Sequence, residues 1–126
     1  MTPTKPTSQS ENVHDSVLVE VPARTEYAAT LRLMVASFGA DTGFSVDEID
    51  DLRLGVNEVF SAATDGDGER VAVRFTTAAG NITVRLSTGA PIEFDQLATT
   101  ILHSVVDAVE VDGGTVTLRK SATDRR

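Results

Sequence analysis

Apolar and polar residues alternate in four short stretches of this chain, which is the pattern of half-buried strands. The alternation runs through residues 16–21, 71–75 and 82–86 and returns near residues 116–118. Residues 78–81, Ala-Ala-Gly-Asn, separate the second stretch from the third and are typical of a tight turn. The sequence therefore predicts four strands, and the middle two form a hairpin.

Three longer stretches carry apolar residues three and four positions apart, which is the spacing of one helix face. They cover about residues 24–43, 46–63 and 94–109. The second stretch follows Ser45, and Glu48 stands three residues after that serine in the pattern of a capping box. The sequence therefore predicts three helices, and the start of the second is the best defined.

In chain order these elements give β-α-α-β-β-α-β within one domain over residues 16–121. Such an order predicts an α+β fold, a two-layer sandwich with three helices on one face of a mostly antiparallel four-stranded sheet. Residues 1–15 are rich in Thr, Ser and Pro and have little to bury, so we expect a disordered leader there. Residues 122–126 are expected to form a short tail.

Composition narrows the class of protein. The 126 residues include 19 acidic and 11 basic ones, and the net charge of -8 disfavours direct binding to nucleic acid. An acidic surface suits a basic protein partner, although it is also an ordinary feature of soluble proteins. The chain has no cysteine, no apolar run long enough for a membrane span and no signal-peptide pattern. We therefore expect a cytoplasmic protein that makes no membrane contact.

Candidate chemistry is concentrated in the second predicted helix. In residues 49–63, IDDLRLGVNEVFSAA, the apolar residues form one stripe, and Glu58 and Ala62 lie four apart on a neighbouring face. This segment resembles a helix of the RsbW-type anti-sigma-factor serine kinases, which belong to the histidine-kinase-like (GHKL) ATPases. The family pattern is I-x-D-L-x-x-A-V-x-E-A-x-x-N-A. The resemblance covers nearly the whole chain and implies a reduced form of the histidine-kinase-like ATPase fold.

The resemblance also implies a site that in the family binds ATP and magnesium. The family's Glu, which activates the attacking group, corresponds to Glu58. Its magnesium-binding Asn corresponds to Ala62, whose methyl group cannot coordinate a cation that requires oxygen ligands. The Asp that recognises adenine corresponds to Ser87, in a motif whose glycine is kept as Gly89. The resemblance therefore implies a degenerate nucleotide site.

The phosphate-binding part of that site is altered as well. The family's Gly-rich loop, G-G-x-G-L, aligns with residues 95–99, where Ala98 and its neighbours replace all three glycines. Asp95 would bring a carboxylate to the place of the phosphates. Only residues 90–94 separate Gly89 from this segment, which is too short for the family's lid over ATP. We therefore expect no cofactor, and ATP with magnesium would be needed only by an active kinase.

Two further patterns have plain interpretations that involve no chemistry. A lone Glu on a helix flank is commonly a solvated charge, so we interpret Glu58 as a vestige of a catalytic residue. The acids of residues 65–69 resemble the start of a calcium loop. However, Arg70 stands where that loop needs Gly, so turn solvation is the better interpretation and no metal site is expected.

The first predicted helix carries a candidate surface for a protein partner. Thr25, Ala29, Arg32 and Ala36 lie on one flank beside its apolar stripe. In the family, an Arg at the position of Arg32 lies on the surface that meets the sigma factor or its antagonist, and the resemblance implies the same role here. Without the resemblance, Arg32 would be an ordinary solvated side chain above small residues.

Three functions follow, and they include both a binding protein and an enzyme. The first is an anti-sigma-factor-like regulator that binds a sigma factor or an anti-anti-sigma protein without transferring phosphate. The alternative is an active ATP-dependent serine/threonine protein kinase with a divergent ATP site. A third function is a regulatory domain that pairs with an intact paralogue. Family members commonly form homodimers through the sheet edge and first helix, and residues 17–21 could supply such an edge.

Overall fold

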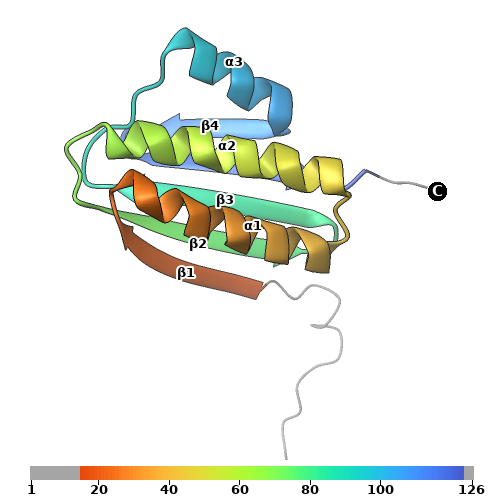
Figure 1. Ribbon diagram of the computed structural model, residues 1–126. Coiled ribbons are helices and arrows are strands. Elements are labelled where there is room, and N and C mark those ends of the chain that lie inside the picture. Colours follow the sequence, from red (N-terminus) through yellow and green to blue (C-terminus); the bar gives the residue numbers. More distant parts are fainter. Residues whose placement is uncertain (1–14, 124–126) are drawn as a thin grey trace, which may run out of the picture.

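The computed structural model describes residues 15–123, in which helices cover one face of a sheet (Figure 1). The predicted leader and tail lie mostly outside these residues, although Asp15 already belongs to the first strand. The elements, in chain order, are β1 (Asp15–Pro22), the 3-10 turn η2 (Thr25–Tyr27), α1 (Ala28–Thr42), α2 (Val46–Thr64), β2 (Arg70–Ala78), β3 (Asn81–Thr88), α3 (Gln96–Val105), β4 (Ala108–Asp112) and β5 (Thr115–Ser121).

The sheet has five strands in the order β1-β2-β3-β5-β4, and every neighbouring pair is antiparallel. The predicted fold class is confirmed, but the prediction of four strands was wrong. Residues 108–112 form β4, whereas the apolar spacing had assigned 94–109 to a helix. That helix ends at Val105 because Val106 is extended, and the β-branched residues that follow pair with β5 across a turn at Gly113.

The core lies between the sheet and its helices. Alternate residues of β2, β3 and β5 point toward the helices and are buried, whereas the residues between them face the open side. Figure 1 shows α1 and α2 lying over one face of the sheet, roughly along its strands, and α3 beside β4. Within residues 15–123, no helix is both long and apolar enough to cross a membrane. The largest fully buried side chains are Phe60, Phe75, Leu31, Leu52, Ile82, Leu86, Leu102 and Leu118.

The start of α2 is fixed by the predicted capping box. Ser45 Oγ accepts a hydrogen bond from the Glu48 backbone N–H at 3.1 Å, and Glu48 Oε1 accepts one from the Ser45 N–H at 2.8 Å. Glu48 Oε2 also accepts from the Thr123 N–H at 2.7 Å, although Glu48 is only 8% exposed. The Ser45 N–H, followed by Thr123, lowers the pKa of Glu48 from 4.5 to about 2. The carboxylate therefore ties the N-terminus of α2 to the end of β5.

Candidate functional site

A small cleft lies between the last turns of α2 and the segment that enters α3. Its volume is about 170 Å³, and Glu58, Ala62 and Ala98 all line it. A larger hollow of about 350 Å³ continues past Ala62 along the turn after α2, toward Ala90 and Pro91. The structure thus brings together three residues that the resemblance assigned to the nucleotide site, although they come from two helices separated in sequence.

The charge of this cleft is negative. Glu58, Asp65, Glu93 and Asp95 all line it, and no lysine or arginine is among the described residues that line either hollow. Glu58 is half-buried, and its side chain makes no hydrogen bond or ion pair with any residue of 15–123. A phosphate group entering here would meet carboxylates without a compensating positive side chain.

The N-terminus of α3 already has an internal carboxylate. Asp95 is the N-cap residue, and its Oδ1 accepts a hydrogen bond from the Ala98 backbone N–H at 2.8 Å. The unpaired N–H groups at a helix start are what make such a terminus a place for phosphate. In this chain, Asp95 satisfies one of those donors and puts its own negative charge at the helix end.

The other two predicted nucleotide positions lie apart from the cleft. Ser87 is on the face of β3 that turns away from the helices, and its hydroxyl lies 3.3 Å from the Thr115 hydroxyl on β5. Gly89 is exposed in the loop after β3, and its φ angle is not positive. Neither residue lines the hollows beside Glu58. Glu58, Ala62 and Ala98 therefore line one cleft, whereas Ser87 and Gly89 lie outside it.

The segment between β3 and α3 is short and is held by the turn between β4 and β5. The Thr88 N–H donates to the Gly114 carbonyl at 2.9 Å, and the Ile92 N–H donates to the Gly113 carbonyl at 3.1 Å. The Ile92 side chain is 4% exposed and belongs to the core. A Cβ atom at Gly114 would lie 2.5 Å from the Thr88 carbonyl oxygen and 2.7 Å from that of Ala90. This segment is thus packed in place as one wall of the hollow.

The described residues do not fit the magnesium ion that the family site implies. Ala62 offers only a methyl group where an oxygen ligand is needed. The acids around the cleft do not compensate, since within residues 15–123 no three Asp, Glu, His or Cys side chains are grouped closely enough to hold a metal ion.

The predicted partner residues lie at the start of α1 and along it. Thr25 belongs to η2 rather than to the helix, and both it and Ala29 are exposed. Arg32 and Ala36 are half-buried on α1. Arg32 Nη1 donates to Asn57 Oδ1 of α2 at 3.1 Å, so the guanidinium is held above the groove between the two helices.

Sequence reasoning missed the α2 side of this groove. Its volume is about 340 Å³, and Asp50, Arg53, Leu54 and Asn57 line it together with Arg32. Leu54 is 41% exposed, and on α1 Leu33 is 72% exposed. Asp50, Arg53, Leu54 and Asn57 are spaced three and four apart on one helix face, which is the signal that could have found them. Their meeting with Arg32 depends on how α1 packs against α2.

A comparison with solved structures supports the predicted fold. The structure matches a crystal structure of the RsbU and RsbW domains of Rv1364c from Mycobacterium tuberculosis with a TM-score of 0.64 and 16% sequence identity. The match covers 86% of this chain and 32% of that one, and at this identity it shows the fold alone. The class is therefore an α+β domain with a reduced histidine-kinase-like ATPase fold.

Sequence similarity then gives the family. The chain is 31% identical over 93 residues to the serine-protein kinase RsbW of Bacillus subtilis, covering 68% of this chain and 58% of that protein. It is 28% identical over 81 residues to the RsbW of Listeria monocytogenes, covering 60% and 51%. No family model matches the sequence. The resemblance to the RsbW-type family is confirmed, although the chain spans only about half the length of these relatives.

Proposed function

We propose that this protein is an anti-sigma-factor-like regulator, which binds a sigma factor or an anti-anti-sigma protein without transferring phosphate from ATP. The observation that carries the proposal is the carboxylate-lined cleft at Glu58, in which Asp95 caps the helix that would otherwise face phosphate. ATP and magnesium are accordingly not expected as cofactors. The proposed place of action is the cytoplasm.

Electrostatics support the loss of nucleotide binding. ATP brings several negative charges, and its family site neutralises them with magnesium and backbone N–H groups. Here Ala62 supplies no ligand, and Glu58, Glu93 and Asp95 add negative charge. Each change disfavours the same ligand.

The outer face of α1 supports a role in protein binding. Arg32 is the only charged residue of α1 before Asp41, and Ala29, Leu33 and Ala40 are exposed. A helix that presents apolar and small residues to water is typical of an interaction surface. Because Asn57 holds Arg32 in position, the remaining guanidinium donors can meet a carboxylate of the partner at a small entropic cost.

The first experiment tests nucleotide binding. Thermal unfolding should be unchanged by millimolar ATP or ADP with magnesium, because only a ligand of the native state raises the melting temperature. A nucleotide-dependent rise that is lost in Glu58→Ala would overturn the non-enzymatic function. A titration by calorimetry should likewise give no heat of binding.

A second experiment tests the partner surface with purified sigma factors and anti-anti-sigma proteins of the source organism. Arg32→Glu should weaken binding at least about tenfold, since interface arginines are frequent hot spots and the reversed charge adds repulsion. Arg24→Glu makes the same charge change at an exposed arginine beside Glu26 and should have little effect. If Glu58→Ala abolishes binding while Arg32→Glu does not, the working surface is the cleft and the assignment is wrong.

The alternative is an active ATP-dependent serine/threonine kinase with a divergent ATP site. Two observations favour it: the relatives from Bacillus subtilis and Listeria monocytogenes carry the name serine-protein kinase, and Glu58 remains in a cleft with Ala62 and Ala98. Incubation of the protein with labelled ATP, magnesium and an anti-anti-sigma protein distinguishes the two functions. Phosphate transfer that disappears in Glu58→Gln would establish the kinase.

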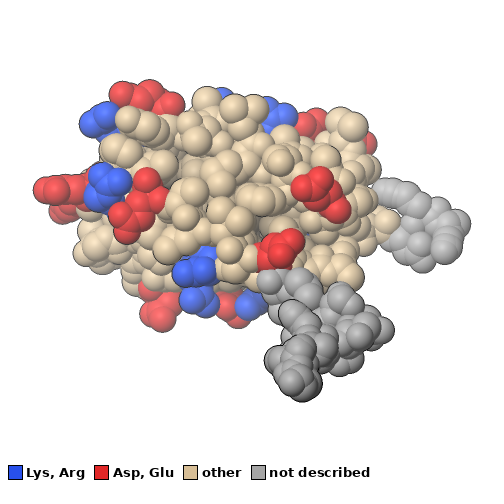
Figure 2. Space-filling model, turned by 90° about the horizontal axis from the view of Figure 1, so that it is seen from below, with Lys and Arg blue, Asp and Glu red and all other residues tan. Residues whose placement is uncertain are grey.

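We further propose a homodimer that uses the edge of the sheet at β1, beside which the described residues place no other strand. This strand is at one end of the sheet, and Val17 and Leu18 are 36% and 51% exposed. Figure 2 looks at the molecule from this side and shows charged side chains scattered around a mainly uncharged centre. Light scattering should give about twice the chain mass of 13.4 kDa. A monomer mass at every concentration would contradict the dimer.

A further inference from the structure

Arginines from three adjacent strands gather on the open face of the sheet. Arg74 of β2 is the direct cross-strand partner of Arg85 of β3. Arg119 of β5 pairs with Thr83, two residues before Arg85 on the same face. The residues on either side of each arginine are buried toward the helices, so all three side chains leave the sheet on the opposite side. We call Arg74, Arg85 and Arg119 the arginine strip.

Nothing within the described chain neutralises most of this charge. Like charges directly opposite each other on two strands destabilise a sheet. Arg74 Nη1 donates to the neutral Ser16 hydroxyl at 2.8 Å, and the Arg85 side chain has no hydrogen bond or ion pair among residues 15–123. Arg119 Nη1 lies 3.6 Å from Glu110 Oε2, but both side chains are about half exposed, so this ion pair is weak. The strip is therefore a concentration of positive charge on a protein whose net charge is -8.

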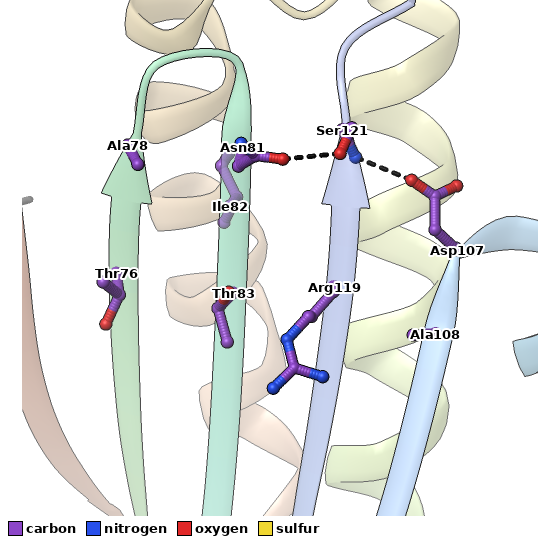
Figure 3. Close-up of a pocket in the computed structure, with 9 residues that line it drawn as sticks. All are labelled: Thr76, Ala78, Asn81, Ile82, Thr83, Asp107, Ala108, Arg119 and Ser121. Carbon is purple, nitrogen blue, oxygen red and sulfur yellow. Dashed lines mark hydrogen bonds between the residues drawn. The ribbon is translucent and has the colours of Figure 1, made fainter. Parts of the chain in front are cut away.

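The surface around the strip is open and rich in hydroxyl groups. A hollow of about 410 Å³ lies at one end of the strip, where Thr76 and Thr83 stand beside Arg119 (Figure 3). Asn81 and Ser121 lie at its far end, and their side chains are hydrogen-bonded to each other. Thr117, between Arg85 and Glu110 in the register, is only 5% exposed on this otherwise wet face. Long side chains thus already lie close over the middle of the sheet.

We propose that the arginine strip is a docking surface for a short acidic segment of a partner protein. Guanidinium groups bind carboxylates through paired hydrogen bonds, and three of them on neighbouring strands fit successive acidic side chains of an extended segment. Strands about 4.8 Å apart place such contacts over roughly 10 Å. The hollow would receive a polar side chain of the same segment through the hydroxyl groups of Thr76 and Thr83.

The shape and charge of the molecule select this class of ligand. A free small anion would find no enclosed site on an open sheet, whereas a peptide gains from several weak contacts made together. A nucleic acid extends its negative charge well beyond the strip and meets the net negative charge of the remaining surface. The proposal is independent of the surface around Arg32, which lies on the helical side of the molecule.

The test uses the whole protein and a short fluorescent peptide of alternating glutamate and threonine. Fluorescence anisotropy at low salt should show binding, and Arg85→Ser should weaken it at least about fivefold because the central contact of the strip is lost. Arg24→Ser, which removes the same charge from an exposed site on the other layer, should change affinity less than about twofold. Amide NMR shifts on titration should map to β2, β3 and β5.

Several results would overturn the proposal. They are no binding by the parent protein, an equal loss in Arg24→Ser, shifts confined to the helices, or displacement of the peptide by millimolar inorganic phosphate or by a single-stranded oligonucleotide. Thermal unfolding gives a separate check. Arg85→Ser should raise the melting temperature, because it removes a like-charge contact. A lower melting temperature would show that Arg85 supports the fold instead of a ligand.

Discussion

The two ends of α2 show opposite relations between charge and structure. At the N-terminus, Asp47 and Glu48 occupy the first turn, and the Glu48 carboxylate accepts hydrogen bonds from Ser45 and Thr123. In the C-terminal half, Asp65 is the C-cap residue, no basic residue is in the last turn, and the Glu58 side chain has no hydrogen bond or ion pair among the described residues. Acids stabilise a helix at its N-terminus and destabilise it at its C-terminus.

This difference separates the acids that stabilise the fold from the acids that line the cleft beside Glu58. The N-terminal acids are explained by stability, because each carries a favourable interaction with the helix or its neighbours. Glu58 and Asp65 have no such interaction, so their negative charge is not explained by the stability of the helix. Substitutions at the two ends should therefore change stability in opposite directions.

The largest expected effect is at the anchored end. Glu48→Ala removes an acceptor shared by two backbone N–H groups, and we expect a loss of about 2–4 kcal/mol in the free energy of unfolding. Urea unfolding followed by circular dichroism measures this loss. Asp47→Ala removes a first-turn acid that is exposed, and it should cost less than about 1 kcal/mol. Equal losses in the two variants would show that the capping box is not the anchor.

A substitution at Gly114, beside the wall of the cleft, should lower stability nearly as much, although no charge is involved. Gly114→Ala places a Cβ against two backbone carbonyl oxygens, those of Thr88 and Ala90, which cannot move as a flexible side chain would. We expect a loss of about 1–3 kcal/mol. Gly89→Ala is the matched control, because a Cβ there meets nothing within 4 Å. A Gly114→Ala variant as stable as the parent would mean that residues 88–92 shift easily.

Acid should weaken the N-terminal anchor before the rest of the fold. The pKa of Glu48 is about 2 in the folded protein and 4.5 as its usual value. A folded-state pKa below the unfolded one adds stability that is present above pH 4.5 and is lost as the pH falls toward 2. Glu48→Gln keeps a hydrogen-bond acceptor but not the charge, so stability should fall less steeply in this variant over that range. Parallel curves would exclude Glu48 as the source.

Sequence patterns predicted those parts of the molecule that depend on local chemistry. The capping box at Ser45, the hairpin across Gly80 and the alternation in β2 and β3 each involve neighbouring residues, and all three were found. The end of the third helix was missed because Val105, Val106 and Val109 are compatible both with the spacing of a helix and with a strand. Only pairing with β5, which comes later in the chain, favours the strand.

In the candidate site, too, only the contacts between residues that are close in sequence could be predicted. Glu58 and Ala62 share a helix face through their spacing, so their proximity could be predicted from sequence. Three other contacts join residues that are distant in the chain or that are placed by strand register. They are the hydrogen bond from the Thr123 N–H to Glu48, the contact of Arg32 with Asn57 and the pairing of Arg74 with Arg85. No local pattern contains that information.

The smallest expected effect is at the C-terminus of α2. There the sign of the change in the free energy of unfolding tests whether the two ends of the helix differ. Asp65→Asn removes a negative charge from the helix C-terminus while leaving its backbone bonds to Ser61 and Ala62 possible, so it should raise the free energy of unfolding by about 0.3–1 kcal/mol. Asp67→Asn removes the same charge two residues further along, where the helix field has faded, and should change stability less. Since the interaction is screened by salt, the gain in Asp65→Asn should shrink in high salt. Urea unfolding of both variants at low and high ionic strength measures these differences. If Asp65→Asn lowers stability instead, then this carboxylate contributes to the fold, and the two ends of α2 are not opposed in the way their charges suggest.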